Sequence, residues 1–391
     1  MSYAGPPPQP LQYLPQYPPL QRRIRKVGAP LGVLITLGTI AGLIVITLTA
    51  FNPVGTGIGL VLSSLAMTVV VLAYLWLDRW EPEPPRLLIF AFLWGATVAV
   101  IIASILQVVT EAAINPGASD NVSPLTVALG APLTEEAAKG LFLVLMMTGR
   151  RRNELNSMTD CLVYAGLVGA GFAWLEDILY IGSGDTVGES LLTAAMRLIM
   201  APFAHPLFTT MTGIGVYFAL QQRNTLAKVG CILLGYIAAV IMHGLWNGSS
   251  LLGVETYFLV YLVWMVPIFG LAIWLGVASR RREQKVVAGK LPGMVTAGLV
   301  TANEATWLDS LRHRKAAIAQ ANRVGGKPAA KSVKKFAHQV VELAFVRDRI
   351  DRGFGDERVN ALLTEEAYGV YGARADAPAL QALAGYRAAG P

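Results

Sequence analysis

The stretch that decides the fold is residues 124–148, PLTVALGAPLTEEAAKGLFLVLMMT. Its length suits a membrane helix, which needs ~20 residues to cross a bilayer, yet Glu135, Glu136 and Lys139 lie inside it. A charged side chain near the bilayer centre costs at least about 2.5–3.5 kcal/mol, so intramembrane carboxylates mark a functional site by default. Lys139 follows the two carboxylates by four and three residues, and we interpret it as their structural ion-pair partner.

The rest of the chain has the composition of a multi-span membrane protein. Of its 391 residues, 54% are hydrophobic and only 15% are charged, and the mean hydropathy of +0.51 excludes an ordinary soluble domain. The net charge of +7 comes from Lys and Arg clusters at the ends of apolar segments, so we expect no nucleic-acid partner. Cys161 and Cys231 lie within apolar segments and indicate neither disulfides nor a thiolate zinc site.

Apolar runs predict an all-α, polytopic integral membrane bundle of about eight transmembrane helices. Lys and Arg occur in every second connection, so both termini are expected in the cytoplasm. We predict a disordered Pro-rich cytoplasmic arm over 1–28, a transmembrane domain over 29–279, and a largely helical cytoplasmic region or tail over 280–391. The predicted membrane helices are 29–51, 55–77, 87–109, 124–148, 158–181, 191–219, 227–246 and 256–279.

Local sequence predicts three further features. Gly130-Ala131-Pro132 is expected to interrupt or kink the fourth membrane helix. Gly166, Gly169 and Gly171 are expected to let the fifth helix approach its neighbours closely. In the C-terminal region, apolar residues at helical spacing predict one amphipathic helix; they are Val333, Phe336, Val340, Leu343 and Ala344.

Polar residues of four predicted helices fall at a common depth. Counted at ~1.5 Å per residue from the cytoplasmic ends, Glu135, Glu176, His205 and His243 all lie roughly 20–27 Å deep. Four unrelated placements would scatter across ~30 Å, so the agreement predicts one site. Asn247 follows His243 by four residues and shares its helical face.

The neighbouring polar residues have structural explanations. Asp177 points about 100° away from Glu176 on a helix, and we interpret it as an interface residue. Arg197 either compensates a carboxylate or extends toward the membrane surface.

The pentapeptide LTEEA occurs at 133–137 and again at 363–367 in the tail, so this short sequence by itself indicates no function. What distinguishes the first copy is its place inside a membrane segment.

Four sequence blocks resemble the PrsW-type intramembrane proteases, relatives of the CAAX-processing and bacteriocin-processing membrane endopeptidases. Residues 135–139 are similar to the family's E-E-x-x-K, residues 171–176 to its G-F-x-x-x-E, and residues 243–247 to its H-x-x-W-N. His205 lies in a block like the third motif, and residues 78–84 resemble the family's acidic, proline-containing loop. The resemblance covers roughly 75–280 and departs at Asp177, where the family usually has Asn.

This resemblance implies an intramembrane endopeptidase of a bacterial plasma membrane, with a membrane-anchored protein as substrate, an anti-sigma factor in the case of the family's founder. The implied catalytic residues are Glu135, Glu136, Glu176, His205, His243 and Asn247. In one mechanism Glu135 or Glu136, with a slight preference for Glu136, is the general base; His243 and Asn247 stabilise the oxyanion, and His205 or Glu176 orients water or the leaving amine. In the other, His205, His243 and Glu136 bind zinc, which activates water.

Two other function classes stay open on the sequence. Membrane-embedded Glu and His residues also form the proton relays of coupled transporters, although no convincing repeat relates the two halves of this chain. A catalytically inert scaffold could instead engage partners through the Pro-rich arm and the basic tail. The oligomeric state is not predicted.

Overall fold

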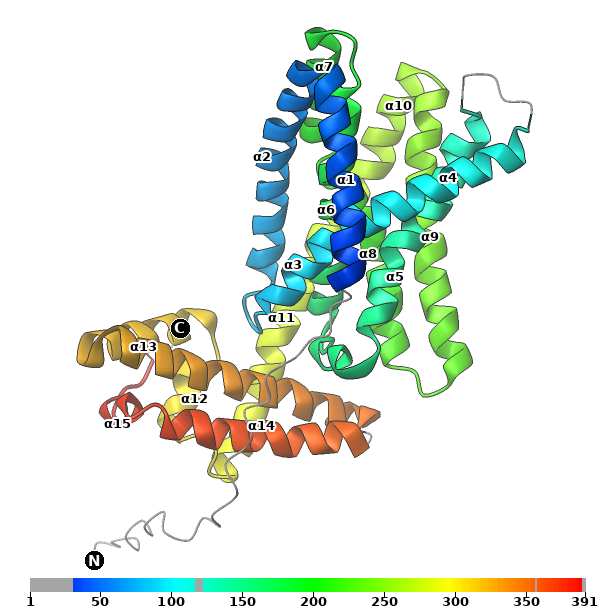
Figure 1. Ribbon diagram of the computed structural model, residues 1–391. Coiled ribbons are helices and arrows are strands. Elements are labelled where there is room, and N and C mark those ends of the chain that lie inside the picture. The colour runs from blue at the N-terminus through cyan, green and yellow to red at the C-terminus, as the bar shows by residue number, and fades with distance from the viewer. Residues whose placement is uncertain (1–30, 117–121, 356, 389–391) are drawn as a thin grey trace, which may run out of the picture.

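The computed structural model describes residues 31–116, 122–355 and 357–388, and the described part of the chain is helical without strands (Figure 1). The predicted arm over 1–28 lies outside these residues. The all-α fold class is confirmed.

The membrane part consists of α-helices and of short π- or 3-10-helical turns, which are labelled η. In chain order they are α1 (Leu31–Phe51), α2 (Pro53–Leu77), α3 (Pro85–Leu93), η2 (Trp94–Ala99), α4 (Val100–Ile114), η3 (Thr126–Gly130), α5 (Ala131–Met146), η4 (Gly149–Glu154), α6 (Met158–Gly182), α7 (Val187–Ala194), η5 (Ala195–Met200), α8 (Ala204–Leu220), α9 (Thr225–Leu251), α10 (Val254–Val260), η6 (Tyr261–Met265) and α11 (Val266–Thr296).

Seven helices of the described residues are long and apolar enough to cross a membrane. The predicted span over 124–148 is formed by η3 and α5, which follow each other without a gap. Its three charged residues set it apart from the other seven by composition, and it packs among α4, α6, α8 and α9. The protein is therefore a multi-pass membrane protein, and the helix with the three charged residues contacts four others.

The fourth predicted helix is continuous and is not interrupted at Gly130-Ala131-Pro132. Residues Thr126–Gly130 form a π-helical turn that leads directly into α5, with Pro132 in its first turn. Pro132 has no N–H to donate to the Ala128 carbonyl, and a wider turn accommodates that loss without ending the helix. A Cβ on Gly244 of α9 would lie 2.6 Å from this same carbonyl oxygen, so α9 packs closely against the turn.

Glycines set the position of α6 at the centre of the bundle, as predicted. A Cβ on Gly171 would lie 1.9 Å from the carbonyl oxygen of Phe92. On Gly169 it would lie 2.6 Å from the Cα of Pro206. Real Cβ atoms do not approach other atoms so closely, so only glycine permits these helix contacts. The second contact places the first turn of α8, and with it His205, against α6.

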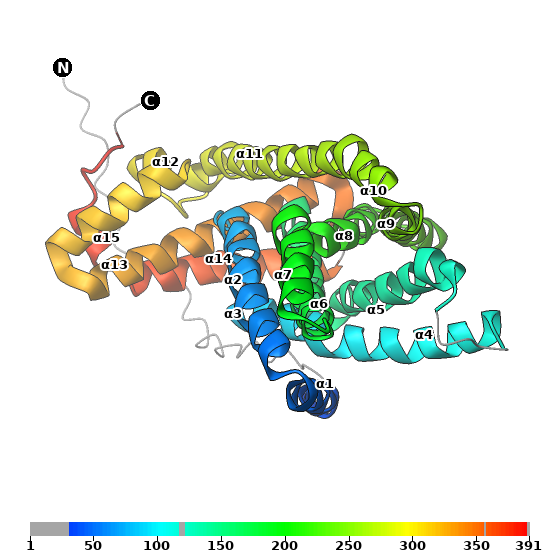
Figure 2. The ribbon, with the colours of Figure 1, turned by 90° about the horizontal axis from the view of Figure 1, so that it is seen from above.

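The C-terminal region forms its own helical layer beyond one end of the bundle (Figures 1 and 2). The predicted amphipathic helix is confirmed, since its five apolar residues are buried within α13. Trp80, from the loop between α2 and α3, is buried in the same core, and the Arg314 guanidinium lies 4.2 Å from its ring centroid. The region comprises the end of α11, α12 (Ala302–Leu308), α13 (Leu311–Arg349), η7 (Ile350–Phe354), α14 (Glu357–Ala375) and α15 (Ala379–Ala382).

Candidate active site

Five of the six predicted catalytic residues meet inside the bundle. Glu135 and Glu136 come from α5, Glu176 from α6, His205 from the first turn of α8, and His243 from α9. Glu136 is fully buried and His243 is 2% exposed. Burying such groups is costly unless each one is paired, and the contacts described below pair all five.

The Lys139 ammonium lies at the centre of the group. Its Nζ is 2.8 Å from Glu136 Oε1 and 3.3 Å from Glu135 Oε2, as its spacing on the helix predicts. Its third polar neighbour is His205 Nδ1, at 2.9 Å. The ring of Phe172, with its centroid 3.8 Å from Nζ, covers another side. Lys139 therefore joins α5 to α8 as well as compensating the two carboxylates.

Each histidine has one ring nitrogen on a carboxylate and the other directed toward Glu135. His243 Nδ1 is 3.0 Å from Glu136 Oε1, while its Nε2 is 3.8 Å from Glu135 Oε2. His205 Nε2 is 2.7 Å from Glu176 Oε2, while its Nδ1 is 4.0 Å from Glu135 Oε2. A carboxylate at one nitrogen fixes both the orientation and the tautomer of an imidazole. The second nitrogen of each ring thus lies within 4.0 Å of the same oxygen, Glu135 Oε2, and His205 Nδ1 also contacts Lys139 Nζ.

Three supporting contacts were not predicted from the sequence. Gln107 of α4 donates its side-chain amide to Glu135 Oε1 at 3.0 Å. The Thr209 hydroxyl donates to Glu136 Oε2 at 3.3 Å, and the Phe208 ring stacks on His243 with centroids 4.7 Å apart. Gln107 could have been found from the sequence, because it is a polar amide within an apolar run and such a residue usually faces a polar partner. Thr209 offered another signal, because it lies one helical turn after His205.

Arg197 compensates a carboxylate, which confirms one of its two predicted roles. Its Nε donates to Asp177 Oδ1 at 2.5 Å, and its Nη2 pairs with Glu176 Oε2. Glu176 thus bridges the Arg197 guanidinium and the His205 ring. Asp177 binds the neighbouring Nε of the same guanidinium, which gives the residue that departs from the family pattern a positioning contact.

Asn247 lies apart from the other five predicted residues. Its side-chain amide donates to the Val127 carbonyl at 3.3 Å, so it connects α9 to the π-helical turn before α5. Within the described residues, no contact joins Asn247 to either histidine. His243 and Asn247 share one face of α9. His243 contacts α5, whereas Asn247, one turn later, contacts η3.

The donor atoms of the cluster suit a metal ion. Glu135, His205 and His243, all buried, offer one ligand atom each within 4.8 Å of one another, the one such group among the described residues. Two histidines and one carboxylate form an established catalytic zinc set. Glu136 and Glu176 hold the outer nitrogens of the two rings, as the supporting residues of zinc sites do. The residues present therefore fit the group that the sequence resemblance implies.

Comparison with known proteins also points to a membrane protease. Residues 83–272 match the model of a family described as the PrsW family intramembrane metalloprotease. The chain is similar to Protease PrsW of Geobacillus kaustophilus, at 26% identity over 58% of this chain and 92% of the relative. It is also similar to Protease PrsW of Bacillus subtilis, at 24% identity over 57% of this chain and 95% of the relative.

No solved structure matches the chain. The matched segment contains every residue of the Glu–Lys–His cluster, and the two relatives are covered over more than nine tenths of their length. Nothing in these matches favours a transporter or an inert scaffold. Over residues 83–272 the chain thus matches the PrsW family, and the protein is an intramembrane protease.

Proposed function

We propose that this protease cuts membrane-anchored proteins at the cluster of α5, α6, α8 and α9, with Glu135, His205 and His243 holding a divalent metal ion, zinc by the donor set. The observation that carries the proposal is the convergence of His205 Nδ1 and His243 Nε2 on Glu135 Oε2. When bound, the metal would lower the pKa of a water molecule to near neutrality and polarise the scissile carbonyl.

The proposal gives Glu135 the ligand role for which the sequence favoured Glu136. Glu136 already accepts contacts from Lys139, His243 Nδ1 and Thr209. We assign it to orienting His243, with the Nδ1–H donating to its carboxylate and the Nε2 lone pair directed toward Glu135. Glu176 does the same for His205, and Arg197 holds Glu176 in place. Both histidines are then neutral, as metal ligands must be.

Lys139 sets the charge of the site. Its Nζ lies 2.9 Å from His205 Nδ1, the atom assigned to the metal, so the ammonium has to release this contact when a metal is held. Its pair with Glu136 at 2.8 Å involves no proposed ligand. Lys139 therefore retains Glu136 as a partner and remains a buried, compensated cation both with and without a bound metal.

A second mechanism is supported by the same ammonium. Lys139 satisfies Glu135, Glu136 and His205 Nδ1 together, which gives these groups partners without a metal. In this alternative Glu135 is the general base, because its hydrogen-bond partners in the described chain are only Gln107 and Lys139, and the two histidine nitrogens lie 3.8 and 4.0 Å away. His243 would then stabilise charge on the substrate oxygen.

For location we propose a bacterial plasma membrane with both termini in the cytoplasm. Arg and Lys in alternate connections support this orientation. It puts the C-terminal region in the cytoplasm, where residues 280–391 would form a separate helical unit on the transmembrane domain of 29–279. An anti-sigma factor with a single membrane span is the substrate class that the resemblance suggests.

The test uses purified protein in liposomes with single-span candidate substrates. We expect Glu135→Gln and His243→Ala to abolish cleavage. Glu365→Gln is the matched control, because it makes the same change in the second LTEEA copy, outside the membrane. Full cleavage by Glu135→Gln or His243→Ala in correctly folded protein would refute the site. Loss of activity with a chelator, restored by zinc, selects the metal mechanism; activity in verified metal-free protein selects the glutamate mechanism.

A further inference from the structure

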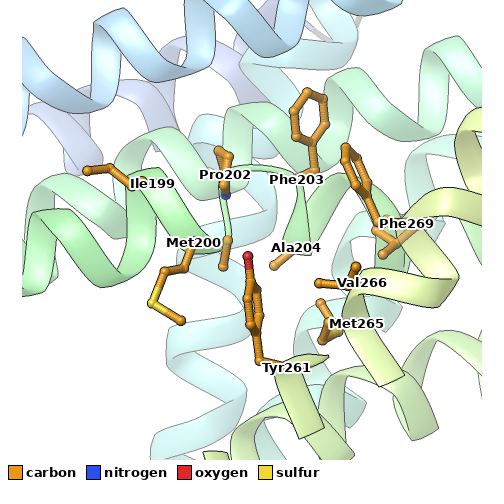
Figure 3. Close-up of a pocket in the computed structure, with 11 residues that line it drawn as sticks. Ile199, Met200, Pro202, Phe203, Ala204, Tyr261, Met265, Val266 and Phe269 are labelled. Carbon is orange, nitrogen blue, oxygen red and sulfur yellow. The ribbon is translucent and has the colours of Figure 1, made fainter. Parts of the chain in front are cut away.

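An apolar cavity of about 200 Å³ lies beside the cluster, at the unwound joint between η5 and α8 (Figure 3). The end of η5 and the first turn of α8 form one wall, and η6 with the start of α11 forms the other. Apart from the Tyr261 hydroxyl, the side chains that line it are apolar. An apolar cavity of about 150 Å³ holds benzene, so this one has room for a large apolar side chain.

The backbone at the cavity is not helical. Ala201 ends η5 with φ −127° and ψ 35°, and Pro202 has no N–H to donate. Among the described residues the Ala201 N–H forms no well-aligned hydrogen bond at this end of η5. Within a membrane, irregular backbone is tolerated only where it is buried in protein or lines a cavity, because unsatisfied polar groups there cost several kcal/mol. Ala201 therefore lines the cavity and carries an N–H that has no well-aligned acceptor.

One wall of the cavity carries His205, and the other wall contacts the helix that carries His243. Ala204, which lines the cavity, directly precedes His205, and η5 carries the Arg197 that pairs with Glu176. On the other wall the Tyr261 ring lies 6.2 Å from the ring of Trp246, between centroids. Trp246 follows His243 by three residues in α9, so it shares that helical face. Both histidines are thus connected to the cavity through adjacent residues.

We propose that this cavity is the subsite for a large apolar side chain, Leu or Phe in size, next to the scissile bond of the substrate's membrane segment. Ala201 N–H would donate to a backbone carbonyl of that segment. This inference rests on the proposed function. A helical substrate has to unwind locally before its peptide bond is accessible, and its freed carbonyls then need donors. A lipid acyl chain would fill the same volume but has no acceptor for Ala201.

The test compares Val266→Trp with Ile273→Trp. Val266 lines the cavity and is 45% exposed, whereas Ile273 lies on the same helix, outside the cavity, and is 53% exposed. The probe is a pool of synthetic single-span peptides with Ala, Leu or Phe at each central position, incubated with the enzyme in liposomes. Mass spectrometry reads the cleavage products.

We expect the wild type to favour Leu or Phe over Ala at one fixed position by about 10-fold or more, the scale for a few methylenes in an apolar pocket. Val266→Trp should reduce this preference to below twofold, and Ile273→Trp should retain it. A wild type without positional preference, or a Val266→Trp enzyme with unchanged preference, overturns the subsite and leaves the hydrolytic site untouched.

A second measurement does not depend on cleavage. Benzoylphenylalanine replaces Val266 or Ile273, and the protein is irradiated with the same peptides. Peptide cross-links from position 266 but not from 273 support the subsite, even where the wild type cleaves nothing and the proposed function fails. Cross-links to phospholipid alone show that an acyl chain occupies the cavity and overturn the proposal.

Discussion

Replacement of Lys139 by Met tests the charge balance on which the site is built. Its Nζ lies 2.8 and 3.3 Å from the Glu136 and Glu135 carboxylates, and Lys139 is fully buried. At an effective dielectric constant of about 20, each pair has a gross attraction of about 5–6 kcal/mol, much of which offsets desolvation. Removing one partner of a buried pair costs about 3–5 kcal/mol, because uncompensated charge remains. We therefore expect the transmembrane domain of Lys139→Met to unfold about 6–20 °C below that of the wild type, at ~2–4 °C per kcal/mol for a unit of its size.

Thermal unfolding in detergent, followed by tryptophan fluorescence, measures the shift. Lys334→Met is the control, because Lys334 is exposed and its loss should change the stability by less than ~0.5 kcal/mol. The double variant Lys139→Met with Glu136→Gln should be more stable than the sum of the single changes predicts, by about 0.5–3 kcal/mol. A Tm of Lys139→Met within 2 °C of the wild type, or strict additivity in the double variant, would refute the assigned charge balance.

Three further predictions concern the packing of α8 against α6 and the loop between α2 and α3. Gly169→Val should displace the first turn of α8, because a Cβ there would lie 2.6 Å from the Cα of Pro206; activity should fall at least tenfold, and unchanged activity would show that α8 tolerates the shift. Burial raises the pKa of Asp78 to about 8, above its unfolded value of ~3.9, so its proton stabilises the native state and stability should fall as pH rises from about 4 to 8. Asp78→Asn should flatten the Tm profile over that range, and a wild-type Tm that rises across it would contradict the shift. Trp80→Ala should loosen the C-terminal region, because Trp80 is buried in its core beneath Arg314; faster tryptic cleavage after Arg280 is expected, and an unchanged digestion rate would argue against docking through this loop.

The sequence was a sound guide to most features that one helix alone decides. The pairing of Lys139 with both glutamates follows from spacings of three and four residues on a single helix. The membrane class, the all-α fold and the buried face of α13 follow from apolar patterns. The sequence predicted an interruption or a kink at Pro132, and the helix is not interrupted, because a π-helical turn absorbs the lost hydrogen bond.

Contacts between helices required the tertiary structure. Equal depth predicted that Glu135, Glu176, His205 and His243 converge, but depth does not fix the rotation of a helix about its axis. That rotation is set by close packing, as at Gly169 against Pro206. It determines that Glu135, and not Glu136, lies near both His205 Nδ1 and His243 Nε2.

The sequence by itself thus determined what kind of protein this is: a membrane bundle with paired carboxylates and histidines at one level, carried by motifs of the PrsW family. The tertiary structure alone placed Asn247 on the Val127 carbonyl, Arg197 between two carboxylates, and an apolar cavity beside His205. The physical reason is that residue spacing sets the depth and face of a side chain within its own helix. Which atoms meet depends on how neighbouring helices pack against that face.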